Sequence, residues 1–343
     1  MKKLLIIILF ISLLIRGQNL LLFDKTNPLY ALDLDGSTEY TYVNNPSGLD
    51  LNSANYLSGD NTAFTTTVGN WVGLTQTSGK ATFSSNATLA TSNLSTQFIS
   101  GHNYTIQLKA KSGSSSALKI KCGTDSTSVN TTTTETTYAF TFTYHSGSQI
   151  ELKGNGTDTY TVDDVDVSEA YDLEINSYFK FTSDIGYQIL FKVEKSGAYI
   201  MYQTSETVIN SIMYDGGIFV QKTLNLNKNN WNRLKTTIKP NSLITDYNGS
   251  ISTTNFSKQR RKIYTSSKLI IGSSNGTVQW ANGQIGWIKF TRKNGLGTIV
   301  NETLYDWKGD ANNFLKDKKG TNHLTGVNVT LPDVVKYSGG KYK

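Results

Sequence analysis

Cysteine, charged residues and histidine are scarce in this chain of 343 residues. The single cysteine, Cys122, excludes an internal disulfide and has the alternating spacing of a small core residue. Only 17% of residues are charged, and no segment repeats apolar residues at helical spacing, which disfavours a helix bundle, a coiled coil or a doubly wound α/β domain. The three histidines, His102, His145 and His323, fit no nucleophile or metal pattern, and Gly-rich phosphate loops are absent, so catalysis has little support.

Small polar residues are abundant instead. The chain has 44 Thr, 34 Ser and 31 Asn, about a third of its length, with aromatic residues recurring throughout. Thr, Tyr, Phe and Val suit pleated strands, whereas Asn, Ser and Gly suit turns. Hairpin turns are predicted by Asp-Gly and Asn-Gly pairs that begin at residues 35, 155, 215, 248, 275, 282 and 294. Composition and length together predict an all-β protein made of two antiparallel β-sandwiches.

The N-terminus has the pattern of a secretory signal peptide, residues 1–17. Lys2 and Lys3 precede an apolar run, 4–15, that is too short to span a bilayer. An uncleaved anchor and a mis-assigned start are the alternatives. Cleavage after Gly17 removes three basic residues and lowers the formal charge from +7 to +4. We therefore expect export through a membrane. We expect no nucleic-acid partner, because cleavage lowers the positive charge and because the basic run 258–262 lacks interleaved aromatic residues.

Composition changes twice along the chain. Residues 53–168 are very rich in Thr and Ser, and they contain clear period-two strands around 104–110 and 138–144. From about residue 169 onward, longer apolar residues, Lys and Asn take over. We therefore place domain edges near 53 and 168. The last stretch, 298–343, is too short to bury a core alone and is expected to pack on a sandwich.

Five phrases, spread over two separate parts of the chain, resemble laminin-G-like, concanavalin A-like sandwiches. These phrases are Ala31–Tyr40, Asn230–Leu234, Asp246–Ser250, Leu269–Gly272 and Asn282–Phe290. The first precedes the Thr/Ser-rich block, and the other four follow it in the order that the family has. The resemblance implies one sandwich built from residues 28–52 plus 169–297.

The block between them resembles jelly-roll carbohydrate-binding modules of the family four/nine type. The matching phrases are Gly69–Trp71, Gly101–Ile106 and Val162–Val167. Nesting of this jelly roll, residues 53–168, in an early loop of the other sandwich is the simplest interpretation, and two sandwiches in tandem are the alternative. Both families serve mainly as glycan- or protein-binding modules on secreted enzymes, adhesins and phage tail proteins.

Alternation separates core from surface on the strands of the block. Phe140 and Phe142, with Tyr138 and Tyr144, share one face of their strand and are expected in the core. Tyr104, Ile106 and Leu108 are expected there too. Their neighbours Gln107 and Lys109 then face outward, where related modules bind an extended glycan, so both are candidate glycan contacts.

An acidic cluster interrupts one predicted strand. The apolar face changes sides across Asp163 and Asp164, which predicts a β-bulge. The resembling modules often hold a structural calcium here, and calcium prefers oxygen ligands. Asp163, Asp164 and Asp60 are the candidate ligands, and plain surface acids are the alternative.

Two tryptophans are candidate ligand contacts in the second sandwich. Trp287 falls where related domains place an outward polar residue, and Trp280 lies one hairpin away. Exposed tryptophans are favoured at binding sites, so both are candidates for a sugar-stacking or protein-contact platform. Packing beneath the tail around Trp307 is the alternative for Trp287, while Trp231 is expected to be structural.

The resemblances imply a secreted or surface-displayed, non-catalytic carbohydrate-binding adhesion protein. Its partner would be a polysaccharide or cell-surface glycan. A phage virion structural protein with glycan-binding modules is one alternative. The other is a concanavalin-fold glycoside hydrolase, for which Asp172 and Glu174 are the nearest pair of carboxylates on one strand face.

Overall fold

The structure is a computed structural model that describes most of the chain after residue 28. The described residues are 29–181, 187–195, 198–205, 207–215, 217–256, 268–273, 279, 281–307, 314–329 and 334–337. Apart from two short 3-10 turns, Gly59–Asn61 and Thr91–Asn93, every regular element in these ranges is a β-strand, and every strand pairing is antiparallel, which confirms the predicted all-β class. No helix in these ranges could cross a membrane. The predicted signal peptide and the basic run 258–262 lie outside the described residues.

Two long sheets form the larger part of the molecule. Sheet A has the order β19-β18-β17-β12-β21-β1-β24, with β22 paired to β21. Its strands are β1 (Leu29–Asp35), β12 (Asp172–Phe181), β17 (Asn232–Ile238), β18 (Ser242–Tyr247), β19 (Ser250–Asn255), β21 (Asn282–Lys293), β22 (Ile299–Tyr305) and β24 (Val334–Tyr337). Sheet B has the order β16-β15-β14-β13-β20-β2-β23. Its strands are β2 (Tyr40–Asn44), β13 (Gln188–Lys195), β14 (Ala198–Ser205), β15 (Val208–Tyr214), β16 (Phe219–Asn225), β20 (Lys268–Ile271) and β23 (Thr325–Val327).

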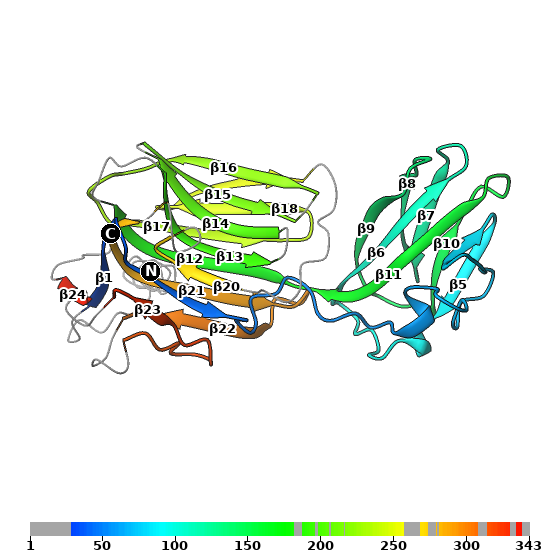
Figure 1. Ribbon diagram of the computed structural model, residues 1–343, viewed down its shortest axis with the longest axis horizontal. Helices are drawn as coiled ribbons and strands as arrows, with labels where there is room; N and C mark the ends of the chain where they lie inside the picture. Colours follow the sequence, from blue (N-terminus) through cyan, green and yellow to red (C-terminus); the bar gives the residue numbers. More distant parts are fainter. Residues whose placement is uncertain are drawn as a thin grey trace, which may run out of the picture.

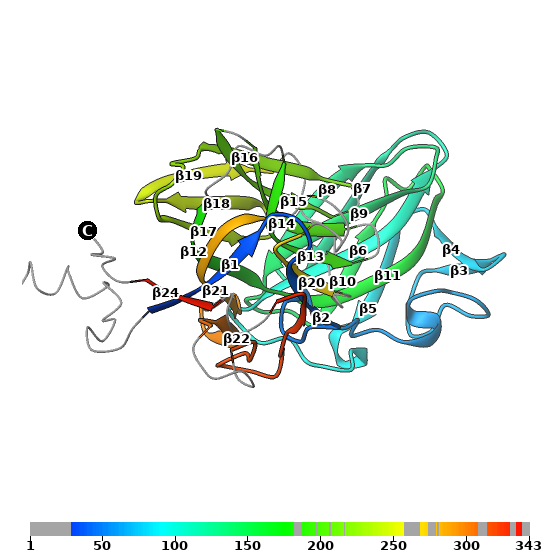
Figure 2. The same ribbon diagram turned by 60° about the vertical axis from the view of Figure 1, so that its left-hand side comes forward.

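Two shorter sheets form the smaller part. Sheet C has the order β3-β4-β11-β6-β9, and sheet D has the order β5-β10-β7-β8. Their strands are β3 (Thr75–Thr77), β4 (Lys80–Phe83), β5 (Asn86–Ala90), β6 (Asn103–Ser112), β7 (Ala117–Cys122), β8 (Asp125–Asn130), β9 (Thr136–Thr143), β10 (Gln149–Lys153) and β11 (Tyr160–Ala170). Figure 2 shows the β3–β4 hairpin projecting at the end of this part.

The chain enters and leaves the smaller part through two adjacent segments. β1 and β2 precede it in sequence, yet they pair with β21 and β20, which follow it. Where the chain crosses, Asn52 bridges Ala170, and the Tyr171 amide donates to the Leu51 carbonyl at 2.9 Å. Figure 1 shows the two parts as separate lobes, joined where β11 runs into β12.

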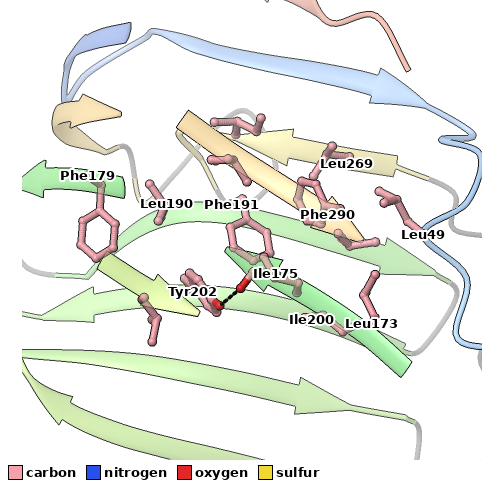
Figure 3. Packing of buried hydrophobic residues seen from close by; sticks show 14 of the residues in the cluster. Leu49, Leu173, Ile175, Phe179, Leu190, Phe191, Ile200, Tyr202, Leu269 and Phe290 are labelled. Atoms are coloured by element: carbon pink, nitrogen blue, oxygen red, sulfur yellow. Dashed lines mark hydrogen bonds between the residues drawn. The ribbon is translucent and has the colours of Figure 1, made fainter. Parts of the chain in front are cut away.

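Each lobe has its own hydrophobic core. The larger core draws residues from 32–51 and from 173–324, and the smaller draws residues from 57–167. Alternation places Leu173, Ile175 and Phe179 inward, where they meet residues of sheet B (Figure 3). The fully buried Tyr202 hydroxyl donates to the Ile175 carbonyl at 3.2 Å and ties the two sheets together.

The residues that alternation predicted to be in the core of the smaller lobe are buried there. Tyr104, Ile106 and Leu108 are buried, as are Phe140 and Phe142. Their flanking aromatics at 138 and 144 are half-buried and pack against the same cluster. Period-two patterning was therefore sufficient to separate the two faces of these strands.

Cys122 is buried in the same core, as expected, with 1% of its surface exposed. Burial raises the pKa of its thiol to about 12. Because the thiolate is the reactive form, we expect the folded protein to resist a thiol reagent at pH 8 and to react fully in denaturant. A colorimetric thiol assay measures both states, and rapid stoichiometric labelling of the folded protein would contradict this burial.

A small polar cluster joins the lobes beside the crossing segments. The His102 Nδ1 lies 2.7 Å from Glu169 Oε1, and its Nε2 lies 3.2 Å from Asn294 Nδ2 on the other lobe. The Tyr171 hydroxyl donates to Glu169 Oε2 at 3.0 Å, and the Arg292 guanidinium lies over the Tyr171 ring at 4.4 Å. These contacts link the two lobes at a third point besides the two crossing segments.

Candidate functional site

The predicted contacts Gln107 and Lys109 lie on the outward face of sheet C. Across the sheet, Gln107 is paired with Ala139, and Lys109 with Thr137. The Lys109 ammonium lies 2.6 Å from Asp164 Oδ2, and this hydrogen bond raises the pKa of Lys109. On β6, β9 and β11 the outward positions carry polar side chains or alanine and no aromatic ring. This face can form hydrogen bonds, but it has no platform on which a sugar ring could stack.

The β-bulge expected at the acidic cluster is present. The register of β11 against β6 shifts between Asp163 and Asp166, and Asp164 adopts a positive φ of 48°. Val165 is thereby turned into the core, where it is fully buried. The parity change in the sequence was a direct signal of this bulge.

The three predicted calcium ligands do not form a ligand set. Asp60 holds its own loop, because its carboxylate accepts hydrogen bonds from the amides and hydroxyls of Thr65–Thr67, which keep its pKa well below the usual range. Burial raises the pKa of Asp163, whose carboxylate lies 3.9 Å from the Lys80 ammonium, and Asp164 pairs with Lys109. No group of three or more His, Cys, Asp or Glu suited to a metal occurs in the described part of the chain. The residues present therefore do not fit the predicted calcium site.

Trp287 is not the exposed platform that its position in the sequence suggested. Its neighbours Ile285 and Ile288 are buried in the inter-sheet core, and Trp287 lies on the opposite, outward face of sheet A. Only 6% of its surface is exposed. Its ring lies 6.4 Å from that of Tyr178, at 19° between planes, and Tyr178 in turn stacks on Trp231 at 4.7 Å. The expected exposure was wrong because the family resemblance indicates the side of the sheet and not the side chains that cover that side.

Trp280, the second predicted platform residue, lies outside the described residues. Trp307, the centre of the alternative packing for Trp287, is fully buried in the larger core and stacks on Tyr305.

The carboxylate pair considered for glycoside hydrolysis is held by lysines. Glu174 Oε2 lies 3.0 Å from the Lys293 ammonium and 3.1 Å from that of Lys235, while Asp172 lies 3.9 Å from Lys239. Burial alone would raise the pKa of Glu174, but hydrogen bonds and charge from the two lysines outweigh it and lower this pKa. Glu174 is therefore held ionised, in a network that spans β12, β17 and β21 on the outward face of sheet A.

This network has a predictable pH dependence. Because the pKa of Glu174 is lower in the folded than in the unfolded chain, its contribution to stability is complete above the unfolded value of about 4.3 and disappears as pH falls through the folded value. We expect Glu174→Gln to destabilise the protein at pH 7, and the difference from wild type to shrink below pH 4. Denaturant titrations at pH 7 and pH 3 test this, and an equal difference at both values would contradict it.

The outward face of sheet B presents a group of aromatic side chains. On β14, Ala198, Ile200 and Tyr202 belong to the core, so the alternating residues Tyr199 and Met201 point the other way. The same alternation holds on β2, β15 and β16. The aromatic members of this face are Tyr40, Tyr42, Tyr199, Tyr214 and Phe219. We use the name sheet B face for these five side chains together with the other outward-pointing residues of β2, β13, β14, β15, β16 and β20.

Strand register places these side chains in rows that cross the sheet. The first row is Phe219, Tyr214, Tyr199, Glu194 and Lys268. The second row is Gln221, Ile212, Met201, Lys192, Ile270 and Tyr42. The third row begins Thr223, Asn210 and Gln203. Aromatic groups therefore lie toward the two sides of the sheet, with a strip between them.

Contacts within the sheet B face hold its rings and ammonium groups in place. The rings of Tyr199 and Tyr214 are 5.5 Å apart at 44°. The Lys192 ammonium lies 5.6 Å above the Tyr199 ring and 2.6 Å from Glu194 Oε2, and the Lys268 ammonium lies 4.8 Å above the Tyr42 ring. Phe219 is 56% exposed, while the four tyrosines are partly exposed.

Amide and hydroxyl groups complete this face. Asn210 is 6% exposed, and its Oδ1 accepts hydrogen bonds from Gln221 Nε2 at 3.0 Å and from Thr223 Oγ1 at 2.7 Å. These bonds fix the orientation of side chains in the second and third rows of the face. Rings with ordered amides beside them are the groups that contact the apolar faces and the hydroxyls of a sugar.

The sheet B face was not predicted from the sequence, although a signal was present. β14 reads Ala-Tyr-Ile-Met-Tyr-Gln-Thr-Ser, and large apolar or aromatic side chains occupy both parities of it. A strand that is buried on one face only normally alternates apolar with polar residues. The sequence could therefore have indicated a functional outward face on this sheet. Its signals are the large side chains at both parities of β14 and the residues Tyr40 and Tyr42 on β2.

The sequence matches no known protein family, and it matches no curated protein. Among solved structures, the family 40 carbohydrate-binding module of the Ruminococcus gnavus IT-sialidase bound to α2,3-sialyllactose is 15% identical. That match covers 35% of this chain and 74% of that one, with a TM-score of 0.31. Domains LG4–5 of the mouse laminin α1 chain are 11% identical, over 62% of this chain and 87% of that one, with a TM-score of 0.31.

The receptor-binding domain of botulinum neurotoxin type G is 12% identical, over 36% of this chain and 35% of that one, with a TM-score of 0.30. These neighbours are concanavalin A-like or jelly-roll β-sandwiches. At such TM-scores they carry no argument about function, which rests on the chain's own side chains.

Proposed function

We propose that this chain is a non-catalytic carbohydrate-binding protein, secreted or displayed on a surface, and that it binds polysaccharide or cell-surface glycan on the sheet B face. The observation that supports this is the joint presence of partly exposed tyrosines and hydrogen-bonded amides on one outward face. Tyr199 and Tyr214 lie in the first row, and the bonded pair Gln221 and Asn210 lies in the second and third rows. These rings are not part of the hydrophobic core, because the core lies on the other side of sheet B.

The groups on this face match what a sugar offers. A pyranose has an apolar face, which stacks on an aromatic ring, and a rim of hydroxyls, which bond to amides and ammonium groups. Asn210 and Gln221 are already oriented by each other, so little conformational entropy remains to be lost when a ligand binds. The polar face of sheet C lacks the rings, and the outward face of sheet A is occupied by the Glu174 lysine network and by the buried Trp287.

A glycan array of the folded chain tests the proposal. We expect binding by the wild type, loss of binding in the double variant Tyr199→Ala with Tyr214→Ala, and retention in the double variant Gln107→Ala with Lys109→Ala on sheet C. Circular dichroism checks that each variant is folded. A folded wild type that binds no glycan would overturn the proposal, and so would unchanged binding by the sheet B variant.

A further inference from the structure

We propose that the ligand of the sheet B face is an extended oligosaccharide that lies across the strands and contacts two separate aromatic groups at once. This inference rests on the proposed function and specifies the size and shape of its ligand. The first group consists of Tyr199, Tyr214 and Phe219 on β14, β15 and β16. The second group consists of Tyr40 and Tyr42 on β2.

The order of the sheet sets the distance between the groups. β14 and β2 are separated by β13 and β20, so three strand spacings lie between Tyr199 and Tyr42. At about 4.8 Å for each spacing, the groups are about 14 Å apart across the sheet. A sugar residue in an extended chain advances by about one strand spacing, so a ligand that touches both groups needs about four or more residues.

The partly exposed residues of the strip between the two groups are charged. Its centre in the second row is Ile270, which is 1% exposed, beside Lys192. The first row supplies Glu194 and Lys268 next to them. No aromatic ring occurs at the outward positions Lys192, Glu194, Lys268 and Ile270 of this strip. Because Ile270 is shielded from solvent, a chain that crosses the strip would meet the ammonium and carboxylate groups of Lys192, Glu194 and Lys268.

Each aromatic group has its own ammonium. Lys192 lies over the Tyr199 ring, and Lys268 lies over the Tyr42 ring. The two groups therefore repeat the same chemistry, a tyrosine with a hydrogen-bond donor beside it, at both sides of the strip. A short sugar can satisfy one group only, whereas a longer chain gains the second contact without a second loss of translational freedom.

The test is the dependence of affinity on chain length. The probes are linear cello-, chito-, manno- and xylo-oligosaccharides and hyaluronan oligosaccharides, each of two to eight residues, titrated calorimetrically into the full chain. We expect affinity for at least one series to rise at least tenfold between two and five residues and then to level off. Tyr42→Ala should reduce the affinity for the longer members to the affinity that the wild type has for the disaccharide.

Two controls make the outcomes separable. Tyr40→Ala is a second variant of the same group, and Ile251→Ala removes an exposed side chain from the edge strand of sheet A and should change nothing. Equal affinity for two and six residues, or a Tyr42→Ala variant that keeps the full length dependence, would overturn this inference alone. Absence of binding for every series and length would count against the proposed function as well.

Discussion

Replacing Tyr199 by alanine is expected to lower the affinity for a bound oligosaccharide at least tenfold. Tyr199 belongs to the first aromatic group of the sheet B face, where it contacts the Tyr214 ring and lies beneath the Lys192 ammonium. Removing a central aromatic contact typically costs more than about 1–2 kcal/mol of binding free energy, and about 1.4 kcal/mol corresponds to a tenfold change. Isothermal titration of wild type and variant with the same glycan measures the ratio.

The matched control is Lys109→Ala, on the face that the sequence alone favoured. Its ammonium is paired with Asp164, and its face has no aromatic ring, so we expect affinity to change less than twofold. Neither substitution removes a core side chain, and both variants should melt within a few degrees of wild type. A Tyr199→Ala variant that binds as tightly as wild type, or a Lys109→Ala variant that loses binding, would show that the wrong face has been assigned.

Replacing Trp287 by alanine is expected to lower the free energy of unfolding by about 3–5 kcal/mol, the usual cost of truncating a buried large aromatic side chain. The ring is 94% shielded from solvent and forms part of the stack with Tyr178 and Trp231, so alanine leaves a cavity there. Glycan binding by the protein that remains folded should be unchanged, since the ring lies on sheet A. Chemical denaturation and titration of the same sample measure both quantities.

Ile251→Ala serves as the comparison for this loss of stability. Ile251 is 71% exposed on the edge strand of sheet A, and its removal should cost less than about 0.5 kcal/mol. A Trp287→Ala variant as stable as Ile251→Ala would mean that Trp287 is exposed in solution. That result would restore Trp287 as a candidate contact for a ligand.

Local patterning predicted more of the fold than of the site. Turn pairs and period-two strands gave the all-β class and the core residues of the smaller lobe, because alternation depends only on neighbours in sequence. The parity change at Asp163 predicted the β-bulge for the same reason.

The candidate site depends on contacts between distant segments. The family resemblance put Trp287 outward, but its burial involves Tyr178 and Trp231, which lie more than 50 residues away in sequence. The sheet B face is assembled from strands that begin at residues 40 and 219, with the rest of the sheet between them. Asp60 was grouped with Asp163 as an acidic residue near the start of the same block, whereas the folded loop supplies it with threonine donors. Such pairings come from the topology, which no single stretch of sequence contains.

The most direct test of the sheet B face is hydroxyl-radical footprinting of the folded chain with and without a bound oligosaccharide. Tyrosine, phenylalanine and methionine side chains report their own exposure in this measurement. Bound glycan should protect Tyr42, Tyr199, Met201, Tyr214 and Phe219 and leave Tyr138 and Tyr144 in the smaller lobe unchanged. Protection confined to the smaller lobe or to sheet A, with full oxidation of Tyr199 and Phe219, would contradict the assignment of the binding face.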